Sequence, residues 1–256
     1  MAPNFFENFC VPVCCYKIDS GLAIVTRICG TAFYINKKGI FLSARHVFED
    51  AFINSAQKNE TVGLMIKPNE GDGSKTAITR VTNLENAPNK VDVCLGKTDF
   101  CAPTNIVHRD FGETLFQEVI TIGYPTDAAV GEIGELFTNT RVHKGIVQRT
   151  IRLGDLSLTP SVQGYELSFV PARGMSGAPL LVVDKATFCL LGICIGSYRS
   201  EEMLSEIVEV SEPSREYRER TVAYNTYGVA QTLSPILDWK PVQGYGSSLR
   251  EMFVGN

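Results

Sequence analysis

A serine between glycines, Ser176, lies in the segment RGMSGAPLL over residues 173–181. Gly174 lets the backbone bend sharply before the serine, and the apolar run after it is typical of a buried strand. Such a turn either only feeds the strand or presents the hydroxyl as a nucleophile. A serine hydroxyl is a poor nucleophile alone, so the second interpretation requires a nearby base and a third group that orients this base.

Histidine and aspartate candidates for those two roles occur earlier in the chain. His46 lies in IFLSARHVFED, where an apolar strand is expected to give way to a short helical turn that exposes the ring at a barrel edge. We expect His108 and His143 to be ordinary surface residues. Asp92 lies in the apolar run VDVCLGK, where an acid is costly to bury without a partner. The alternative for Asp92 is an edge strand that leaves its carboxylate in water.

Taken together, four segments resemble the trypsin-like serine proteases: GTAFYINKKGIFLSARHVF, VDVCLGK, ITIGYP with KGIVQR, and RGMSGAPLLVVDKATFCLLGICIG. The resemblance covers roughly residues 20–240 and is closest to the HtrA/Deg-type protease domain without a PDZ domain. It implies an all-β, chymotrypsin-like fold of two antiparallel six-stranded β-barrels, with the site in the cleft between them. It also implies a catalytic triad of His46, Asp92 and Ser176.

In this interpretation the protein is a serine endopeptidase that acts on a protein or peptide substrate through an acyl-enzyme. His46 takes the Ser176 proton and returns it to the leaving amine, while Asp92 fixes the imidazole tautomer. The backbone N–H groups of Gly174 and Ser176 are expected to form the oxyanion hole.

The resemblance also suggests a specificity pocket, with its floor at Val170 and its wall at Ile195, Gly196 and Ser197. None of these residues carries a charge, so a basic P1 side chain would bury an unpaired cation. We therefore predict apolar or small P1 residues. Glutamates of the insertion that follows, Glu201 or Glu202, are an alternative source of charge for this pocket.

Two positions depart from the family pattern. Met175 stands where the family commonly has an aspartate, so a new N-terminal ammonium would have no partner there, and we expect a protein that is not a zymogen. Val47 stands where secreted members have a cysteine that is disulfide-bonded to the region of Cys29, so that bridge cannot form. We therefore expect activity and melting temperature to be insensitive to reductant.

Two other functions are alternatives to that of a protease. A catalytically silent or partner-gated regulatory module on the same fold remains open, because fold does not imply function. An α/β-hydrolase esterase is disfavoured, since Ala178 replaces the last glycine of G-x-S-x-G and the order of the three residues is reversed.

The composition argues against several further classes. A net charge of −4 over 256 residues gives no support for nucleic-acid binding, and no apolar run reaches the length of a membrane span. Without a basic leader, the eight cysteines are expected to be reduced, in a cytoplasmic compartment. The cluster Cys10, Cys14 and Cys15 has neither a CxxC pair nor a nearby histidine, so we predict no metal site and no cofactor.

Short β-rich segments recur along the chain and predict the domain organisation. We expect an N-terminal extension (1–19), a first barrel with His46 and Asp92 (20–110), a second barrel with Ser176 (111–240) and a loosely held tail (241–256).

Four segments between or after the expected strands have their own predictions. PNEGDGS at 68–74 is typical of a hairpin tip, and 98–114 reads as a linker between the halves. SPILDW at 234–239 predicts a short C-terminal helix. The helical spacing of Met203 and Ile207 within 200–220 favours an amphipathic helix, the alternative being a solvated insertion with one apolar face packed down.

Overall fold

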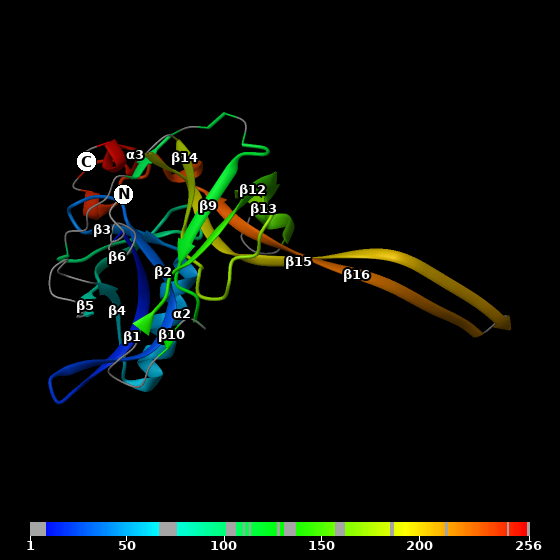
Figure 1. Ribbon diagram of the computed structural model, residues 1–256, viewed down its shortest axis with the longest axis horizontal. Coiled ribbons are helices and arrows are strands. Elements are labelled where there is room, and N and C mark those ends of the chain that lie inside the picture. The colour runs from blue at the N-terminus through cyan, green and yellow to red at the C-terminus, as the bar shows by residue number, and fades with distance from the viewer. Residues whose placement is uncertain are drawn as a thin grey trace.

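Two large β-sheets form most of the described structure (Figure 1). The computed structural model describes residues 9–66, 76–100, 106–109, 111–112, 114–126, 129–130, 137–156, 162–184, 187–212, 215–244 and 246–254. The expected hairpin tip at 68–74 and part of the expected linker at 98–114 lie outside these residues. The all-β fold predicted from the sequence is confirmed.

The first sheet is a half-barrel whose described strands have the order β5-β4-β1-β2-β3-β7-β6, with every pair antiparallel. The strands are β1 (Cys10–Asp19), β2 (Leu22–Tyr34), β3 (Ile40–Ser43), β4 (Thr61–Ile66), β5 (Ala77–Arg80), β6 (Thr82–Asn86) and β7 (Cys94–Lys97). The first six residues of β1 are buried, and β1 pairs with both β2 and β4. The expected N-terminal extension is therefore corrected, because from residue 10 onward the chain belongs to the sheet.

Helix α2 (Arg45–Lys58) follows β3 and is longer than the short turn expected around His46. It buries one face, formed by Val47, Phe48, Ala51 and Ser55, whose spacing matches the helical repeat. The helix ends at Asn59 in the left-handed conformation, a common helix stop. The apolar face holds the helix against the half-barrel and fixes the position of its first turn, which carries His46.

Six strands of the second sheet close into a ring, in the order β14-β9-β12-β13-β16-β15, because β14 also pairs with β15. A further strand, β8, pairs in parallel with β15 on its outer side. The strands are β8 (Ile106–His108), β9 (Glu118–Gly123), β12 (Arg141–Arg152), β13 (Gln163–Leu167), β14 (Pro179–Asp184), β15 (Thr187–Glu212) and β16 (Arg215–Thr232). The short strands β10 (Ala129–Val130) and β11 (Phe137–Thr138) pair with each other, and η2 (Leu153–Leu156) is a 3-10 turn.

The largest cluster of buried apolar side chains spans both sheets. It includes Phe33 and Leu42 from the first sheet and Leu190 and Val229 from the second. The two sheets therefore share a core, and this core holds them in a fixed position relative to each other.

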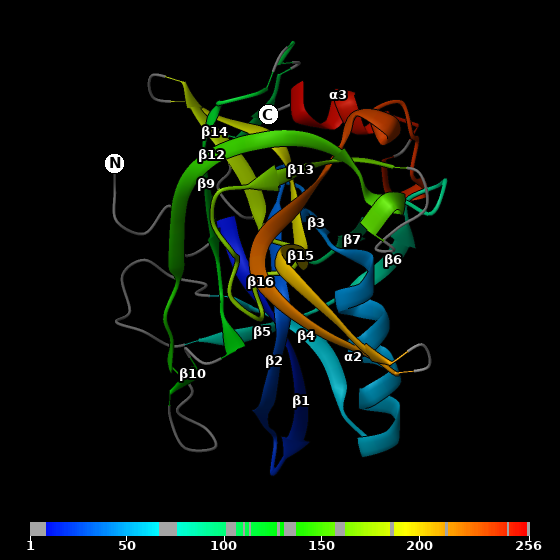
Figure 2. The same ribbon diagram turned by 90° about the vertical axis from the view of Figure 1, so that its right-hand side faces the viewer.

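Strands β15 and β16 continue beyond the ring as a two-stranded arm, defined here as residues 199–212 and 215–226 (Figure 1). Figure 2 views the molecule with this arm directed toward the reader. The amphipathic helix predicted for 200–220 is wrong, because the backbone groups of this segment pair across the hairpin instead. Its alternative, an insertion with a packed apolar face, does not fit either, since Met203, Leu204 and Ile207 are all more than half exposed.

The C-terminal residues also differ from expectation. The predicted helix at 234–239 is only a 3-10 turn, η3 (Ser234–Ile236), and another such turn, η4 (Val242–Gly244), follows it. The tail, expected to be loosely held, forms helix α3 (Leu249–Val254), which buries Leu249, Met252 and Phe253. Ser248 and Glu251 form a capping box at its start, with the Glu251 N–H donating to Ser248 Oγ and the Ser248 N–H donating to Glu251 Oε2.

Candidate active site

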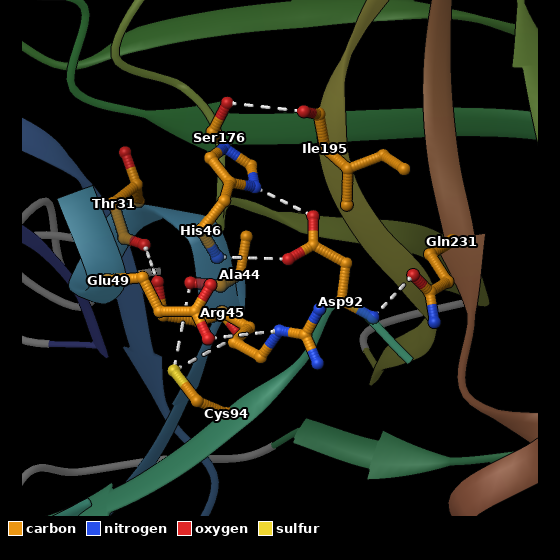
Figure 3. A network of polar contacts seen from close by, with 11 residues as sticks. Thr31, Ala44, Arg45, His46, Glu49, Asp92, Cys94, Ser176, Ile195 and Gln231 are labelled. Carbon is orange, nitrogen blue, oxygen red and sulfur yellow. Dashed lines mark hydrogen bonds and ion pairs between the residues drawn. The ribbon is translucent and has the colours of Figure 1, made fainter. Parts of the chain in front are cut away.

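His46, in the first turn of α2, and Asp92, two residues before β7, form a close pair (Figure 3). Nδ1 of His46 lies 2.7 Å from Oδ2 of Asp92, and the His46 backbone N–H donates to the other carboxylate oxygen at 3.0 Å. Asp92 is only 7% exposed, so the expected alternative of a solvated edge-strand carboxylate is excluded. With Nδ1 engaged by Asp92, Nε2 is the ring nitrogen left to exchange a proton.

The backbone of Asp92 is held by helix α2 and by the second sheet. Its N–H donates to Oε1 of Gln231 on β16 at 3.0 Å, and its carbonyl accepts from the Arg45 N–H at 3.3 Å. Gln231 is fully buried, and sequence analysis did not single it out. Its side chain therefore connects Asp92 to the second sheet, which also carries the turn at Ser176.

The pKa of His46 is raised above its ordinary value of 6.5. Burial on its own lowers this pKa, but the hydrogen bond and negative charge of Asp92 outweigh that effect, with help from the charges of Asp50 and Glu49. The pair therefore stabilises the imidazolium, the state that a general base reaches after it accepts a proton.

Ser176 lies in a turn whose two flanking glycines have left-handed backbone angles. The φ angles are +96° at Gly174 and +88° at Gly177. A Cβ at Gly174 would lie 2.6 Å from the Thr126 nitrogen, and one at Gly177 would lie 2.0 Å from the Thr31 carbonyl oxygen. The turn therefore requires glycine at both positions for its conformation and for its close packing.

Thr31, on β2 of the first sheet, holds this turn from the opposite side of the cleft. Its N–H donates to the Ser176 carbonyl at 2.9 Å, and its hydroxyl donates to the Gly174 carbonyl at 3.0 Å. The same hydroxyl accepts from the Tyr124 N–H at 3.0 Å. Thr31 was missed in the sequence because a threonine within a strand pattern carries no signal of its long-range partners.

The backbone of the turn leaves two N–H groups available. The N–H groups of Met175, Gly177 and Ala178 all donate to backbone carbonyls. Among the described residues, those of Gly174 and Ser176 have no such acceptor. These are the two groups predicted to form the oxyanion hole, and their unused donors are consistent with that role.

The Ser176 hydroxyl donates to the Ile195 carbonyl at 3.4 Å, and within the described structure no hydrogen bond joins it to His46. Both residues nevertheless line one cavity of about 340 Å³. Figure 3 shows the His46 ring between Ser176 and Asp92. A change of the Ser176 side-chain rotamer is the smallest movement that would redirect its hydroxyl, and catalytic hydrogen bonds are often long before substrate binds.

The four expected specificity residues lie on neighbouring segments. Ile195 lies next to Ser176 through the hydrogen bond described above. Gly196 follows it at a bulge, and an added Cβ there would have no atom within 4 Å. Ser197 is exposed and pairs with Gly228, where an added Cβ would meet the backbone of Phe169. Val170, which follows Phe169 in the chain, is 39% exposed.

The remaining histidines are not plain surface residues. The His143 ring stacks on Phe169 with centroids 5.4 Å apart, and its Nε2 is buried without a hydrogen-bond partner among the described residues. Burial and the nearby charge of Arg141 lower the pKa of His143. His108 lies on β8, with its ring 5.9 Å from that of Phe253. Neither lines the cavity that contains Ser176.

No three His, Cys, Asp or Glu side chains of the described chain are arranged to hold a metal ion. The cysteines that can be described are all free thiols. No described helix has both the length and the apolar character needed to cross a membrane.

The comparisons with known proteins come from structure alone. No protein-family model and no curated protein sequence matches the chain. The fold is similar to that of the Rv3671c protease from M. tuberculosis in its active form, with a TM-score of 0.52 and 16% sequence identity. The match covers 90% of this chain and 78% of the other. At this identity the likeness establishes that the two chains share a fold, and both the protease activity and the HtrA/Deg subtype stay predictions.

Proposed function

We propose that the protein is a serine endopeptidase with His46, Asp92 and Ser176 as its catalytic triad. The observation that carries this proposal is the His46–Asp92 pair, in which Asp92 is buried and His46 lines the same cavity as Ser176, on a turn formed by two glycines with positive φ. No other described histidine lines that cavity.

The geometry supports a specific order of events. Ser176 Oγ attacks the scissile carbonyl and passes its proton to Nε2 of His46, because Nδ1 is occupied by Asp92. The N–H groups of Gly174 and Ser176 stabilise the oxyanion, and the imidazolium then protonates the leaving amine. Water repeats the sequence to hydrolyse the acyl-enzyme. No cofactor or metal is needed for any of these steps.

The substrate is proposed to be a protein or peptide with an apolar or small P1 residue. Val170, Ile195, Gly196 and Ser197 carry no charge that could pair with lysine or arginine. Glu201, the alternative source of charge, pairs with Tyr224 at the base of the arm and is exposed. A peptide library dominated by cleavage after lysine or arginine would refute this assignment.

Activity is proposed not to require an activating cut. Met175 is fully buried in an apolar cluster with Leu180 and Val147, so packing holds the turn where an ion pair would otherwise do so. We therefore expect the intact chain to react with a serine-directed probe. Labelling that appears only after trimming near residue 23 would contradict this.

A partner-gated regulatory module is the second candidate, favoured by one observation. The Ser176 hydroxyl faces the Ile195 carbonyl and not His46. This orientation of the hydroxyl is expected in a protein whose site is completed only when a partner or peptide binds.

A fluorophosphonate probe tests both candidates, because it labels only an activated serine. We expect labelling of the wild type and none of Ser176→Ala, with peptide hydrolysis lower by about 10⁴–10⁶-fold. Ser205→Ala, in the arm, is the matched control and should behave as the wild type. Labelling that depends on an added partner favours the gated module, and wild-type turnover by folded Ser176→Ala refutes the proposed nucleophile.

A further inference from the structure

Two cysteines meet in the wall of the candidate active site. Sγ of Cys15, on β1, lies 3.4 Å from Sγ of Cys29, on β2. The pairing of β1 with β2 shifts register here, from Val13 opposite Gly30 to Cys14 opposite Ile28, which leaves Cys29 as the extra residue of a bulge. Bulges re-aim side chains next to functional sites, and this one brings the two sulfur atoms together.

The two thiols differ in their access to solvent. Cys15 is fully buried in the core of the half-barrel. Cys29 is only partly buried and lines the same cavity as His46 and Ser176. A small oxidant in the cavity therefore reaches Cys29 first, and Cys15 is placed behind it.

The hydrogen bond with Cys15 and the nearby Arg27 favour a thiolate at Cys29. Nη2 of Arg27 lies 3.0 Å from Sγ of Cys15, and Glu60 and Asp50 are the nearby acids. The hydrogen bond from Cys15 lowers the pKa of Cys29 to about 7, against the opposing effect of burial and with help from Arg27. The same hydrogen bond, together with burial, raises the pKa of Cys15.

The other described cysteines have no such environment. Burial raises the pKa of each of the other five, all of which are buried: Cys10, Cys14, Cys94, Cys189 and Cys194. Buried neutral thiols are poor nucleophiles. Reactivity toward oxidants is therefore expected to concentrate at Cys29.

Cys29 is also connected to the nucleophile turn. It lies two residues before Thr31, whose N–H and hydroxyl hold the carbonyls of Ser176 and Gly174. Between them, Gly30 has no room for a side chain, since an added Cβ would lie 2.5 Å from Val47 and 3.1 Å from the Ser176 carbonyl. A movement of β2 at Cys29 would therefore displace the turn at Ser176, because no free space separates them at Gly30.

We propose that Cys15 and Cys29 form a redox pair in the cleft wall, in which oxidation by a peroxide to a Cys15–Cys29 disulfide lowers the reactivity of Ser176. The second half of this statement rests on the proposed protease function. A disulfide has an S–S length of about 2.05 Å, so the sulfurs must approach by more than 1 Å from their present separation. That movement displaces the bulge that supports Thr31.

The chemistry is a two-electron oxidation in two steps. The Cys29 thiolate attacks one oxygen of hydrogen peroxide, the O–O bond breaks and hydroxide leaves, giving a sulfenic acid at Cys29. Cys15 then attacks this sulfur, the S–O bond breaks and water leaves as the disulfide forms. Two thiols are oxidised, and one peroxide is reduced to two waters. The insensitivity to reductant expected from the sequence still holds for the reduced protein, and only an oxidant reveals the pair.

The experiment treats the intact reduced protein with hydrogen peroxide and maps its disulfides by mass spectrometry of peptides. We expect a Cys15–Cys29 linkage, reversed by dithiothreitol, and a fall of about 10²-fold in the rate of fluorophosphonate labelling, the cost of a displacement near 1 Å at a catalytic group. Cys29→Ser and Cys15→Ala should each abolish the linkage and the dithiothreitol-reversible fall in labelling. Cys14→Ala, the matched control, should retain both.

Each outcome has one meaning. Failure to find the linkage overturns the redox pair, and a linkage that leaves labelling unchanged overturns its control of Ser176. Equal loss of labelling in Cys29→Ser also overturns it, because another site would then be responsible. A reduced wild type that never labels refutes the protease function, while the peptide map still decides whether the pair forms.

Discussion

The base side and the nucleophile side of the cavity are held by different kinds of contact. On the base side, the His46 ring is oriented by one side-chain contact, to Asp92, and Asp92 is anchored by the Gln231 side chain. On the nucleophile side, backbone groups of the turn at Ser176 meet β2, chiefly at Thr31. The base side therefore depends on side-chain chemistry, whereas the nucleophile side depends chiefly on backbone conformation and close packing, with one side-chain hydroxyl, that of Thr31, added to them.

The largest expected effect breaks the base side. In Asp92→Asn the side-chain amide no longer fixes the required tautomer of His46, so kcat should fall by about 10⁴-fold with little change in folding. Steady-state kinetics on a peptide substrate measure this. Asp238→Asn, at a highly exposed position, is the matched control and should leave kcat unchanged. Near-normal kcat in Asp92→Asn would show that Asp92 is not part of the triad.

The pH dependence tests the same contact. Protonated His46 cannot accept the Ser176 proton, so kcat/KM should fall as the pH drops through the His46 pKa, which lies above 6.5. In residual activity of Asp92→Asn the midpoint should move to lower pH, because the favourable charge is gone. The same raised pKa means that the ion pair stabilises the fold below pH 6.5 and that this contribution is lost as pH rises through the folded-state pKa. An acid midpoint that does not move contradicts the assignment.

The next effect breaks the nucleophile side by adding one methyl group. In Gly177→Ala the new Cβ would lie 2.0 Å from the Thr31 carbonyl oxygen and 2.4 Å from Ser43 Oγ, at a φ of +88°. We expect a loss of about 3 kcal/mol or more in the free energy of unfolding, from strain and overpacking together. Urea unfolding measures this. Gly112→Ala, where nothing lies within 4 Å, should cost far less, and equal losses in the two variants would contradict the argument.

A smaller effect is expected at Thr31. Two substitutions there distinguish the hydrogen bonds of its hydroxyl from the packing of its side chain. Thr31→Val removes the hydroxyl that donates to the Gly174 carbonyl and accepts from the Tyr124 N–H, and each lost hydrogen bond should cost about 1–3 kcal/mol. Thr31→Ser keeps the hydroxyl and should retain most of the stability and of the fluorophosphonate labelling rate. If the serine and valine variants lose labelling equally, packing and not hydrogen bonding is what Thr31 supplies to the turn.

The smallest effect is expected far from both sides. Residues 201–224 of the arm can be replaced by an Asn-Gly turn, because Ser200 and Asn225 are paired across the hairpin. The arm side chains whose burial is described are exposed or partly exposed, and none belongs to a core cluster, so the melting temperature and the labelling rate should stay near those of the wild type. A large fall in either would show that the arm supports the cavity.

The sequence predicted the fold class and the candidate triad because both depend on local patterns. Short apolar strands with turn residues between them indicate an all-β chain, and the segments around His46, Asp92 and Ser176 resemble those of a known family. Thr31 and Gln231 escaped prediction because their importance comes from partners more than 90 residues away in the chain. The meeting of Cys15 and Cys29 escaped for a related reason, since it depends on a bulge that shifts the register.

The errors in secondary structure have physical causes. Met203 and Ile207 are spaced as on a helix, but the strand formed by residues 215–226 offers hydrogen bonds to every second residue, and that pairing is invisible in a local window. The helix at the C-terminus had a visible signal, since Ser248 and Glu251 have the spacing of a capping box. The segment was misjudged because its glycine and serine content outweighed that signal.

The position of β1 has a consequence for proteolytic processing. The tip of the β1–β2 hairpin is exposed, with Leu22 at 72%. A cut there would leave β1 bound between β2 and β4 as a separate peptide, because six of its residues are buried. The new amino group would remain in water at the end of a hairpin, with no buried carboxylate at Met175 to receive it. Nicking at this loop would therefore produce a two-chain molecule with an unchanged interior.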